Sequence, residues 1–138
     1  IEIKFKGSTP SAVRECRHKE FVNLTSRLFE IHCDAQGAIT EMTLEGDHVA
    51  KLCSLNVNGG RNVALKQNTT QSEADTPGNF PSDLAVDGNH LADFSQQSCT
   101  LTHVPDVKVK PTWNLTFDKS YLVTRFVLYS NADEFGRL

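Results

Sequence analysis

Residues 121–129 read YLVTRFVLY, and this stretch carries the strongest fold signal in the chain. β-Branched and aromatic side chains dominate it, and such residues favour extended strands. Just before it, Trp113, Leu115 and Phe117 alternate with polar residues, which is the two-residue period of a strand with one buried face. The sequence therefore predicts strand in both segments and places Trp113 in the hydrophobic core.

Shorter strand-like segments precede this stretch. Residues 1–6 alternate apolar and polar side chains, and residues 27–33 (RLFEIHC) form two distinct faces. The apolar face, predicted to point inward, has Phe29, Ile31 and Cys33, opposite Leu28, Glu30 and His32. Further strands are expected at 39–44, 49–57 (with Cys53, Leu55 and Val57 inward) and 62–66, before a polar surface loop at 67–83. Because no segment shows a helical period, these short strands and turns predict an all-β sandwich or barrel.

The length and charge of the chain limit its class. A chain of 138 residues fits a single domain, 1–138, with room for a hydrophobic core. The net charge is −3 and no Lys/Arg block stands out, so we expect no nucleic-acid partner. No apolar run is long enough to cross a bilayer, which argues against direct membrane insertion. No nucleophile elbow, phosphate-binding loop or zinc-protease motif is present, and we expect no enzyme activity.

Cysteines and sequons point to an oxidising compartment. Two disulfides are expected, with the pairing open, among Cys16, Cys33, Cys53 and Cys99, because these cysteines lack the close spacing of a zinc site. Three glycosylation sequons begin at Asn23, Asn68 and Asn114. Together these features predict a protein that is secreted or is the extracellular part of a membrane protein.

Several short motifs follow one another along the chain. They read LCSLNV at 52–57, NVALK at 62–66, TQS at 70–72, AVDGN at 85–89, SCT at 98–100 and PTWNL at 111–115. Together they resemble the F-type lectin (fucolectin) family, whose domains are jelly-roll β-sandwiches of the galactose-binding-like and discoidin-like superfold. The family's closing half matches residues 1–58 and its opening half matches 61–138, so the order is circularly permuted. A cut between neighbouring repeats of a tandem array would give the same order.

The resemblance implies which cysteines pair. The family joins the cysteines of its SCT and LC motifs, which implies a bond between Cys99 and Cys53 here. A second bridge within the closing half implies Cys16 with Cys33. The loop closed by this second bridge corresponds to a stabilisation of about 3 kcal/mol in the chain-entropy estimate.

The resemblance also implies a sugar site with altered specificity. The family binds fucose through one histidine and two arginines. Here Leu101 stands at the histidine position and one arginine is missing, so canonical fucose recognition is not expected. An arginine suits a sugar site because its fixed fork can bond two hydroxyls at once. The implied sugar-binding residues are His103, Asn131, Asp133 and Arg137.

A calcium site is the third implication of the resemblance. The matching positions are the side chains of Asp87, Asn89 and Ser98 and the backbone carbonyls of Leu84 and Cys53. Ser54 stands where the family has a glutamate, which removes one carboxylate. Calcium takes six to eight oxygen ligands and gains affinity with ligand charge, so weak binding or none is expected. On its residues alone, Asp87-Gly88-Asn89 is equally well a plain tight turn.

These features favour an extracellular carbohydrate-binding module that acts in cell-surface recognition. Its partner would be a glycan or a cell-surface glycoprotein. The alternative is a protein-binding adhesion or receptor-ectodomain module that has lost sugar binding, because folds of this kind support both uses. A hydrolase is the third hypothesis, and it requires two carboxylates at a suitable separation in a cleft.

Overall fold

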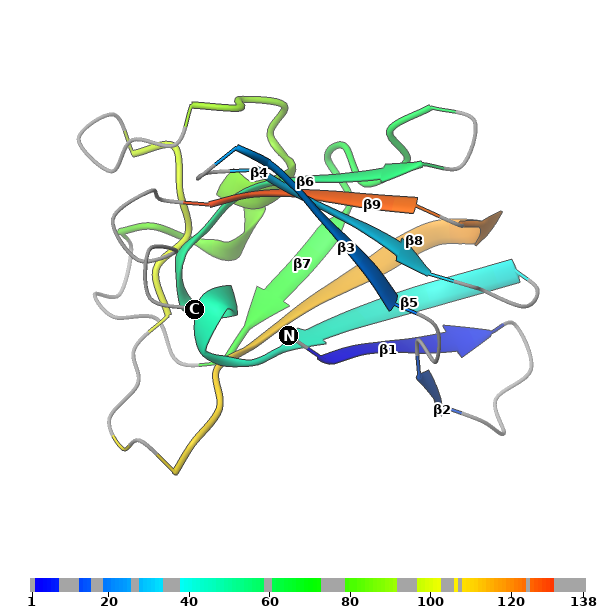
Figure 1. The fold of residues 1–138 in the computed structure, drawn as a ribbon, viewed down its shortest axis with the longest axis horizontal. Helices are drawn as coiled ribbons and strands as arrows, with labels where there is room; N and C mark the ends of the chain where they lie inside the picture. The colour runs from blue at the N-terminus through cyan, green and yellow to red at the C-terminus, as the bar shows by residue number, and fades with distance from the viewer. Residues whose placement is uncertain are drawn as a thin grey trace.

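Two antiparallel β-sheets face each other in the computed structural model of this protein (Figure 1). The structure describes residues 2–7, 13–15, 19–25, 28–33, 38–58, 61–72, 79–91, 97–102, 106, 108–123 and 125–130. These residues are mostly strand, with two short 3₁₀ helices, η1 (Asp47–Lys51) and η2 (Ser82–Val86). The prediction of an all-β chain with two packed sheets is confirmed.

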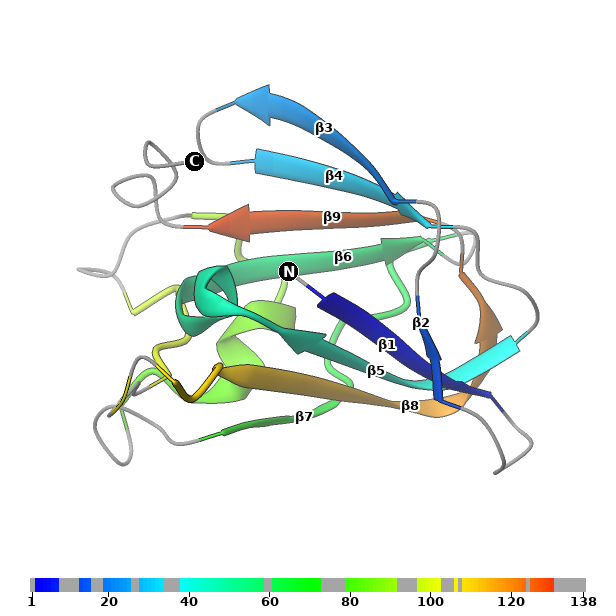
Figure 2. The same cartoon turned by 60° about the horizontal axis from the view of Figure 1, so that its bottom comes forward.

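Each sheet combines strands that lie far apart in the sequence (Figure 2). The five-stranded sheet has the order β2 (Val13–Glu15), β1 (Glu2–Gly7), β5 (Ala38–Glu45), β8 (Thr112–Leu122) and β7 (Asn68–Gln71). The four-stranded sheet has the order β3 (Lys19–Thr25), β4 (Leu28–Cys33), β9 (Arg125–Ser130) and β6 (Leu52–Asn58). Strand β7 therefore lies at an edge, next to the long strand β8.

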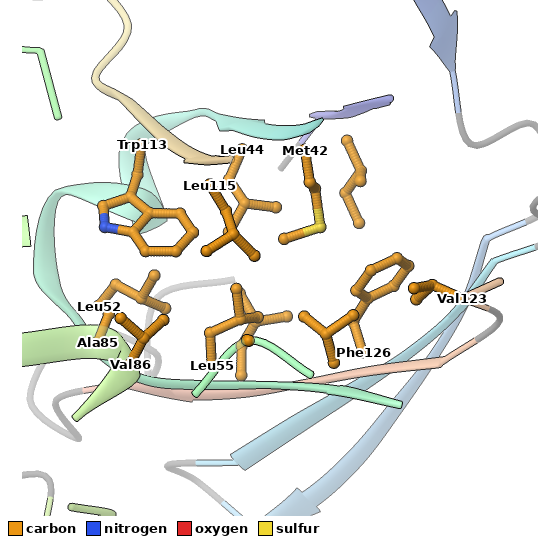
Figure 3. Packing of buried hydrophobic residues seen from close by; sticks show 14 of the residues in the cluster. Met42, Leu44, Leu52, Leu55, Ala85, Val86, Trp113, Leu115, Val123 and Phe126 are labelled. Carbon is orange, nitrogen blue, oxygen red and sulfur yellow. The ribbon is translucent and has the colours of Figure 1, made fainter. Parts of the chain in front are cut away.

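The core lies between the sheets, where the inward side chains of both layers meet (Figure 3). Met42, Leu44, Trp113 and Leu115 come from the five-stranded sheet and meet Leu55 and Phe126 of the other layer. The predicted inward positions that the structure describes are indeed buried: Ile31, Cys53, Leu55, Val57, Trp113, Leu115 and Phe117. Each large apolar side chain removed from water contributes about 1.5–3 kcal/mol, so this alternation accounts for much of the stability.

The segment 121–129 is two strands rather than one. Strand β8 ends at Leu122 in the five-stranded sheet, and β9 begins at Arg125 in the four-stranded sheet. Val123 lies between them and is only 1% exposed, so it is part of the core where the chain crosses from one layer to the other. Leu122, just before it, is 69% exposed. The buried positions change from odd to even numbers across the crossing, from Val123 to Phe126 and Leu128. The nearly continuous apolar stretch 121–129 hides this change, which is why the sequence pattern does not show the break.

Three other predicted boundaries are wrong. Residues 49–51 belong to η1 instead of extending β6, and residues 63–66 form a turn where a strand was expected. The predicted loop at 67–83 contains β7 and the start of η2. Strand β7 reads NTTQ, so it has no apolar alternation, and it becomes a strand only by pairing with β8.

The Cys53–Cys99 disulfide joins β6 to the segment 97–102. This is the pairing that the family resemblance implies. The backbone N–H groups of Thr100 and Thr102 donate to the carbonyls of Leu52 and Ala50, at 2.7 and 2.8 Å, so the segment runs alongside the start of β6. The expected partner bond between Cys16 and Cys33 lies outside the described residues.

Candidate functional site

A polar hollow opens at the surface where β7 begins beside η2. Its volume is ≈ 480 Å³, and the described residues around it are Lys66, Gln67, Asn68, Thr69, Ser82, Asp83, Val86 and Asp87. All of these except Val86 carry polar side chains. Ligand sites are concave and orient their ligands through a few polar groups. The polar side chains around this hollow can donate hydrogen bonds to the hydroxyls of a ligand and accept hydrogen bonds from them.

One wall of the hollow is the turn at 63–66. Lys66 has a φ of 57°, in the left-handed region that non-glycine residues seldom occupy. Its backbone N–H donates to the carbonyl of Val86 at 2.8 Å, which fastens the turn to the end of η2. A residue held in this region costs on the order of 1–3 kcal/mol, and such residues cluster at binding sites. The bond to Val86 therefore sets the distance between the turn and η2.

Asn62 anchors the same turn to β6. Its side-chain Oδ1 accepts hydrogen bonds from the backbone N–H groups of Val57 and Ala64, each at 3.1 Å. The N–H of Val63 donates to the carbonyl of Val57 at 2.9 Å. One amide side chain thus connects the core strand to the wall of the hollow.

Replacing Asn62 with alanine is expected to lower the free energy of unfolding by about 2 kcal/mol, because two partly buried N–H groups lose their acceptor. Asn62→Asp is the matched control, since it keeps an oxygen at that position and should be markedly less destabilised. Urea unfolding followed by tryptophan fluorescence measures both variants. Equal losses in the two variants would contradict the acceptor role of Oδ1.

Some polar groups around the hollow are fixed by other side chains. The Thr69 hydroxyl donates to Ser82 Oγ at 2.9 Å, and Trp113 Nε1–H donates to the Ser82 carbonyl at 3.1 Å. Gln67 donates to Asp118 Oδ1 and accepts from the Asp118 N–H, both at 2.9 Å. Hydrogen bonds from Gln67 and Tyr121 hold the pKa of the Asp118 carboxyl below its ordinary value. These contacts position the polar groups of Gln67, Thr69 and Ser82 in the lining of the hollow and connect Ser82 to the core through Trp113.

Other groups around the hollow remain available. Within the described part of the chain, the side chains of Lys66, Asn68 and Asp83 make no hydrogen bond or ion pair, and all three residues are exposed. Asp87 uses one oxygen, Oδ1, to accept the N–H of Asn89 at 2.7 Å. The hollow therefore offers an ammonium donor, an amide and carboxylate acceptors to a ligand.

The side-chain oxygens at the predicted calcium positions already make hydrogen bonds to nearby residues. Ser98 Oγ donates to the Leu91 carbonyl at 2.6 Å, and Ser54 Oγ lies 3.0 Å from His90 Nδ1. Asn89 Oδ1 accepts the N–H of Leu91 at 3.0 Å, so residues 87–91 form two successive side-chain-to-backbone turns.

This donor set does not fit a tight calcium site. Asp87 is its sole carboxylate, because Ser54 stands where the resembled family has a glutamate, and calcium affinity rises with ligand charge. No cluster of three or more His, Cys, Asp or Glu side chains occurs among the described residues. The local hydrogen bonds account for Asp87-Gly88-Asn89 as a turn without a metal.

The predicted sugar-binding residues His103, Asn131, Asp133 and Arg137 lie outside the described residues. Just before His103, the structure describes Leu101 and Thr102. The N–H of Leu101 donates to the Phe80 carbonyl at 3.2 Å, and Thr102 is buried. Sequence reasoning did not identify Lys66, because it was assigned to a short strand at 62–66. It did not identify Asp83, because a polar stretch without periodicity is typical of any surface loop.

The three sequons have different surroundings. Asn68 is exposed at the first position of β7, whereas Asn114 is half-buried in the middle of β8. Asn114 Nδ2 donates to Glu41 Oε1 at 2.8 Å and to Thr43 Oγ1 at 2.7 Å. Partial burial raises the pKa of the Glu41 carboxyl, but hydrogen bonds from Asn114 and Lys6 outweigh this and leave it below its ordinary value. Asn23 lies in β3, and its side chain is not among those described.

A second polar cluster lies on the outer face of the four-stranded sheet. Glu30 faces outward as predicted, yet it is only 6% exposed. Its Oε1 forms an ion pair with Arg125 and lies 2.7 Å from His32 Nε2. Because these partners already satisfy the buried carboxylate, the cluster is accounted for as part of the structure of the sheet.

No protein-family model, curated protein or solved structure matches this chain. Among the described residues, no helix has the length and apolar character that a membrane span requires. Function therefore has to be inferred from the chemistry of the hollow and from the sequence motifs.

Proposed function

We propose that this protein is an extracellular carbohydrate-binding module that holds a saccharide unit in the hollow between β7 and η2. The observation that carries this proposal is the set of available groups there: the Lys66 ammonium, the Asn68 amide and the Asp83 carboxylate. A sugar hydroxyl both donates and accepts, so donors and acceptors around one hollow can bind neighbouring hydroxyls. Hydrogen bonds to a charged group are roughly twice as strong as neutral ones.

Two further features support the proposal. The Cys53–Cys99 pairing is the one that the F-type lectin resemblance implies, and the proposed fold is a circularly permuted jelly roll of that type. A buried disulfide also fits an oxidising, secreted environment. Leu101 stands where the resembled family has its fucose-binding histidine, so we propose a specificity other than fucose.

Binding without catalysis is proposed because of the exposure of the carboxylates. Asp83 and Asp87 both line the hollow, as a hydrolase would require, but both residues are exposed to water. A glycoside hydrolase keeps one carboxyl of its pair protonated by burying it in apolar surroundings. An open rim is better suited to reversible recognition.

A glycan array tests the proposal on chain produced in a bacterial periplasm, where disulfides form and the sequons stay unmodified. We expect selective binding that Asp83→Asn weakens about tenfold, the equivalent of about 1.4 kcal/mol. Asp106→Asn is the matched control, since Asp106 is exposed but does not line the hollow. Because the calcium donor set is poor, a chelator should change the signal little.

The outcomes of the array separate the hypotheses. If Arg137→Ala abolishes binding and Asp83→Asn does not, the sugar site lies in the loops at His103 and residues 131–137 instead of the hollow. An array without any bound glycan would overturn the carbohydrate proposal and favour the protein-binding alternative.

A further inference from the structure

Asn68 has two properties that together suggest regulation of the hollow. It begins the sequon Asn68-Thr69-Thr70, and it is one of the residues that line the hollow. We propose that an N-glycan on Asn68 covers the hollow and blocks carbohydrate binding there, so that the glycosylated protein is the closed form. This proposal rests on the proposed function, because it concerns the same site.

The chemistry of attachment is available at Asn68. Nδ2 of its amide forms a bond to the anomeric carbon of the first sugar and loses one proton, while the carbon–oxygen bond to a lipid-diphosphate carrier breaks and the diphosphate leaves with the electron pair. The Asn68 side chain has no competing hydrogen bond within the described residues. It is exposed on an edge strand, which leaves room for a sugar chain.

Asn114 provides the contrast. Its Nδ2 already donates to Glu41 and Thr43, so replacing one of its hydrogens with a sugar would break one of these two bonds. Asn114 also lies in the interior of the five-stranded sheet, between β5 and β7. Of these two sequons, the structure favours modification at Asn68.

A sugar chain that starts at the wall of the hollow has an advantage over free ligands. Its effective concentration near Lys66 and Asp83 is on the order of millimolar, because a short tether keeps it close. Its hydroxyls carry the same chemistry that the hollow is proposed to bind. The attached glycan would therefore outcompete a free glycan of similar affinity whose concentration is below the millimolar range.

Two substitutions at Thr70 test the covering directly. Thr70 is exposed and does not line the hollow, so Thr70→Ala removes the sequon and leaves the wall unchanged, whereas Thr70→Ser keeps the sequon. Both variants and the wild type would be produced in a eukaryotic secretory host. Acetylation by an N-hydroxysuccinimide ester, followed by peptide mass spectrometry, then measures the accessibility of the Lys66 ammonium.

We expect Lys66 to react several-fold more slowly in wild type and Thr70→Ser than in Thr70→Ala. Lys108 is the internal control, because it is exposed and does not line the hollow, and it should react equally in all three proteins. Equal reactivity of Lys66 in all three, or an unmodified Asn68 in the glycopeptide map of wild type, would overturn the proposal.

The binding readout uses the array glycan that gives the strongest signal with the unmodified periplasmic chain. Thr70→Ala from the eukaryotic host should bind it at least tenfold more tightly than wild type does. Equal binding by both, with Lys66 protected in wild type, would show that the hollow is covered but is not the recognition site. That result would overturn the block, and with it carbohydrate binding at the hollow. Absence of any array glycan would overturn the proposed function and the block that rests on it, whereas Lys66 protection would still show whether the glycan covers the hollow.

Discussion

A chain in which both Cys53 and Cys99 are replaced by alanine is expected to lose about 4 kcal/mol of unfolding free energy. The bond joins residues 46 positions apart, and the chain-entropy estimate for a loop of that length is about 4 kcal/mol. Both cysteines are 0% exposed, and alanine adds no polar group to the interior. A domain is typically stable by only about 5–15 kcal/mol, so this loss is a large part of the total.

Urea unfolding followed by tryptophan fluorescence measures this loss, since Trp113 is the one tryptophan of the chain. The comparison variant replaces Cys16 and Cys33, whose expected bond closes a shorter loop and should contribute about 3 kcal/mol. Without its bond, the segment 97–102 would be held to the start of β6 mainly by the backbone bonds of Thr100 and Thr102. A loss below about 1 kcal/mol in the first variant would mean that the bond contributes little to stability.

Trp113→Ala is expected to lower the free energy of unfolding by about 3–5 kcal/mol. The indole is 0% exposed in the core, and its removal leaves a cavity that the neighbouring side chains fill only in part. The variant also removes the hydrogen bond from Nε1–H to the Ser82 carbonyl in η2. The effect should therefore extend from the core to Ser82 in the lining of the hollow.

Two further variants separate the causes of this loss. Trp113→Phe keeps an aromatic ring but loses the indole N–H, and we expect it to cost about half as much as Trp113→Ala. Leu122→Ala changes an apolar side chain that is 69% exposed, and its effect should stay within about 0.5 kcal/mol. Unfolding of all three variants is followed by circular dichroism, because the Trp113 variants lack the one tryptophan of the chain. A loss in Trp113→Ala no larger than that in Leu122→Ala would contradict the buried position of the indole.

Local alternation predicted the core well, because a strand has a short and strict period. Trp113, Leu115 and Phe117 are buried where the pattern placed them. The crossing at Val123 was missed because the pattern says nothing about which sheet a strand joins. The turn at 63–66 was read as a strand because its apolar residues are common to both structures. The positive φ of Lys66 and the hydrogen bond from the Gln67 N–H to the Ala64 carbonyl, which mark it as a turn, have no signal in the sequence pattern.

The hollow could not be predicted from the sequence for a different reason. Its walls come from 66–69 and from 82–87, two segments that no periodic pattern relates. They meet because β7 pairs with β8 and because η2 is bonded to the turn through Val86 and Lys66. The Cys53–Cys99 pairing, by contrast, could be predicted from the family motifs, although the spacing of the cysteines left it open.

The pairing of distant strands has a consequence for how the protein folds during synthesis. Strand β5 pairs with β8, where Leu44 lies opposite Trp113, and β6 pairs with β9, where Val57 lies opposite Phe126. Folding slows when contacts join residues far apart, because the entropy of closing the loop is lost before the contacts form. At a synthesis rate of about 5–20 residues per second, the early strands wait seconds for their partners. Through that interval the nascent chain exposes apolar strand faces, and chaperones would have to protect them.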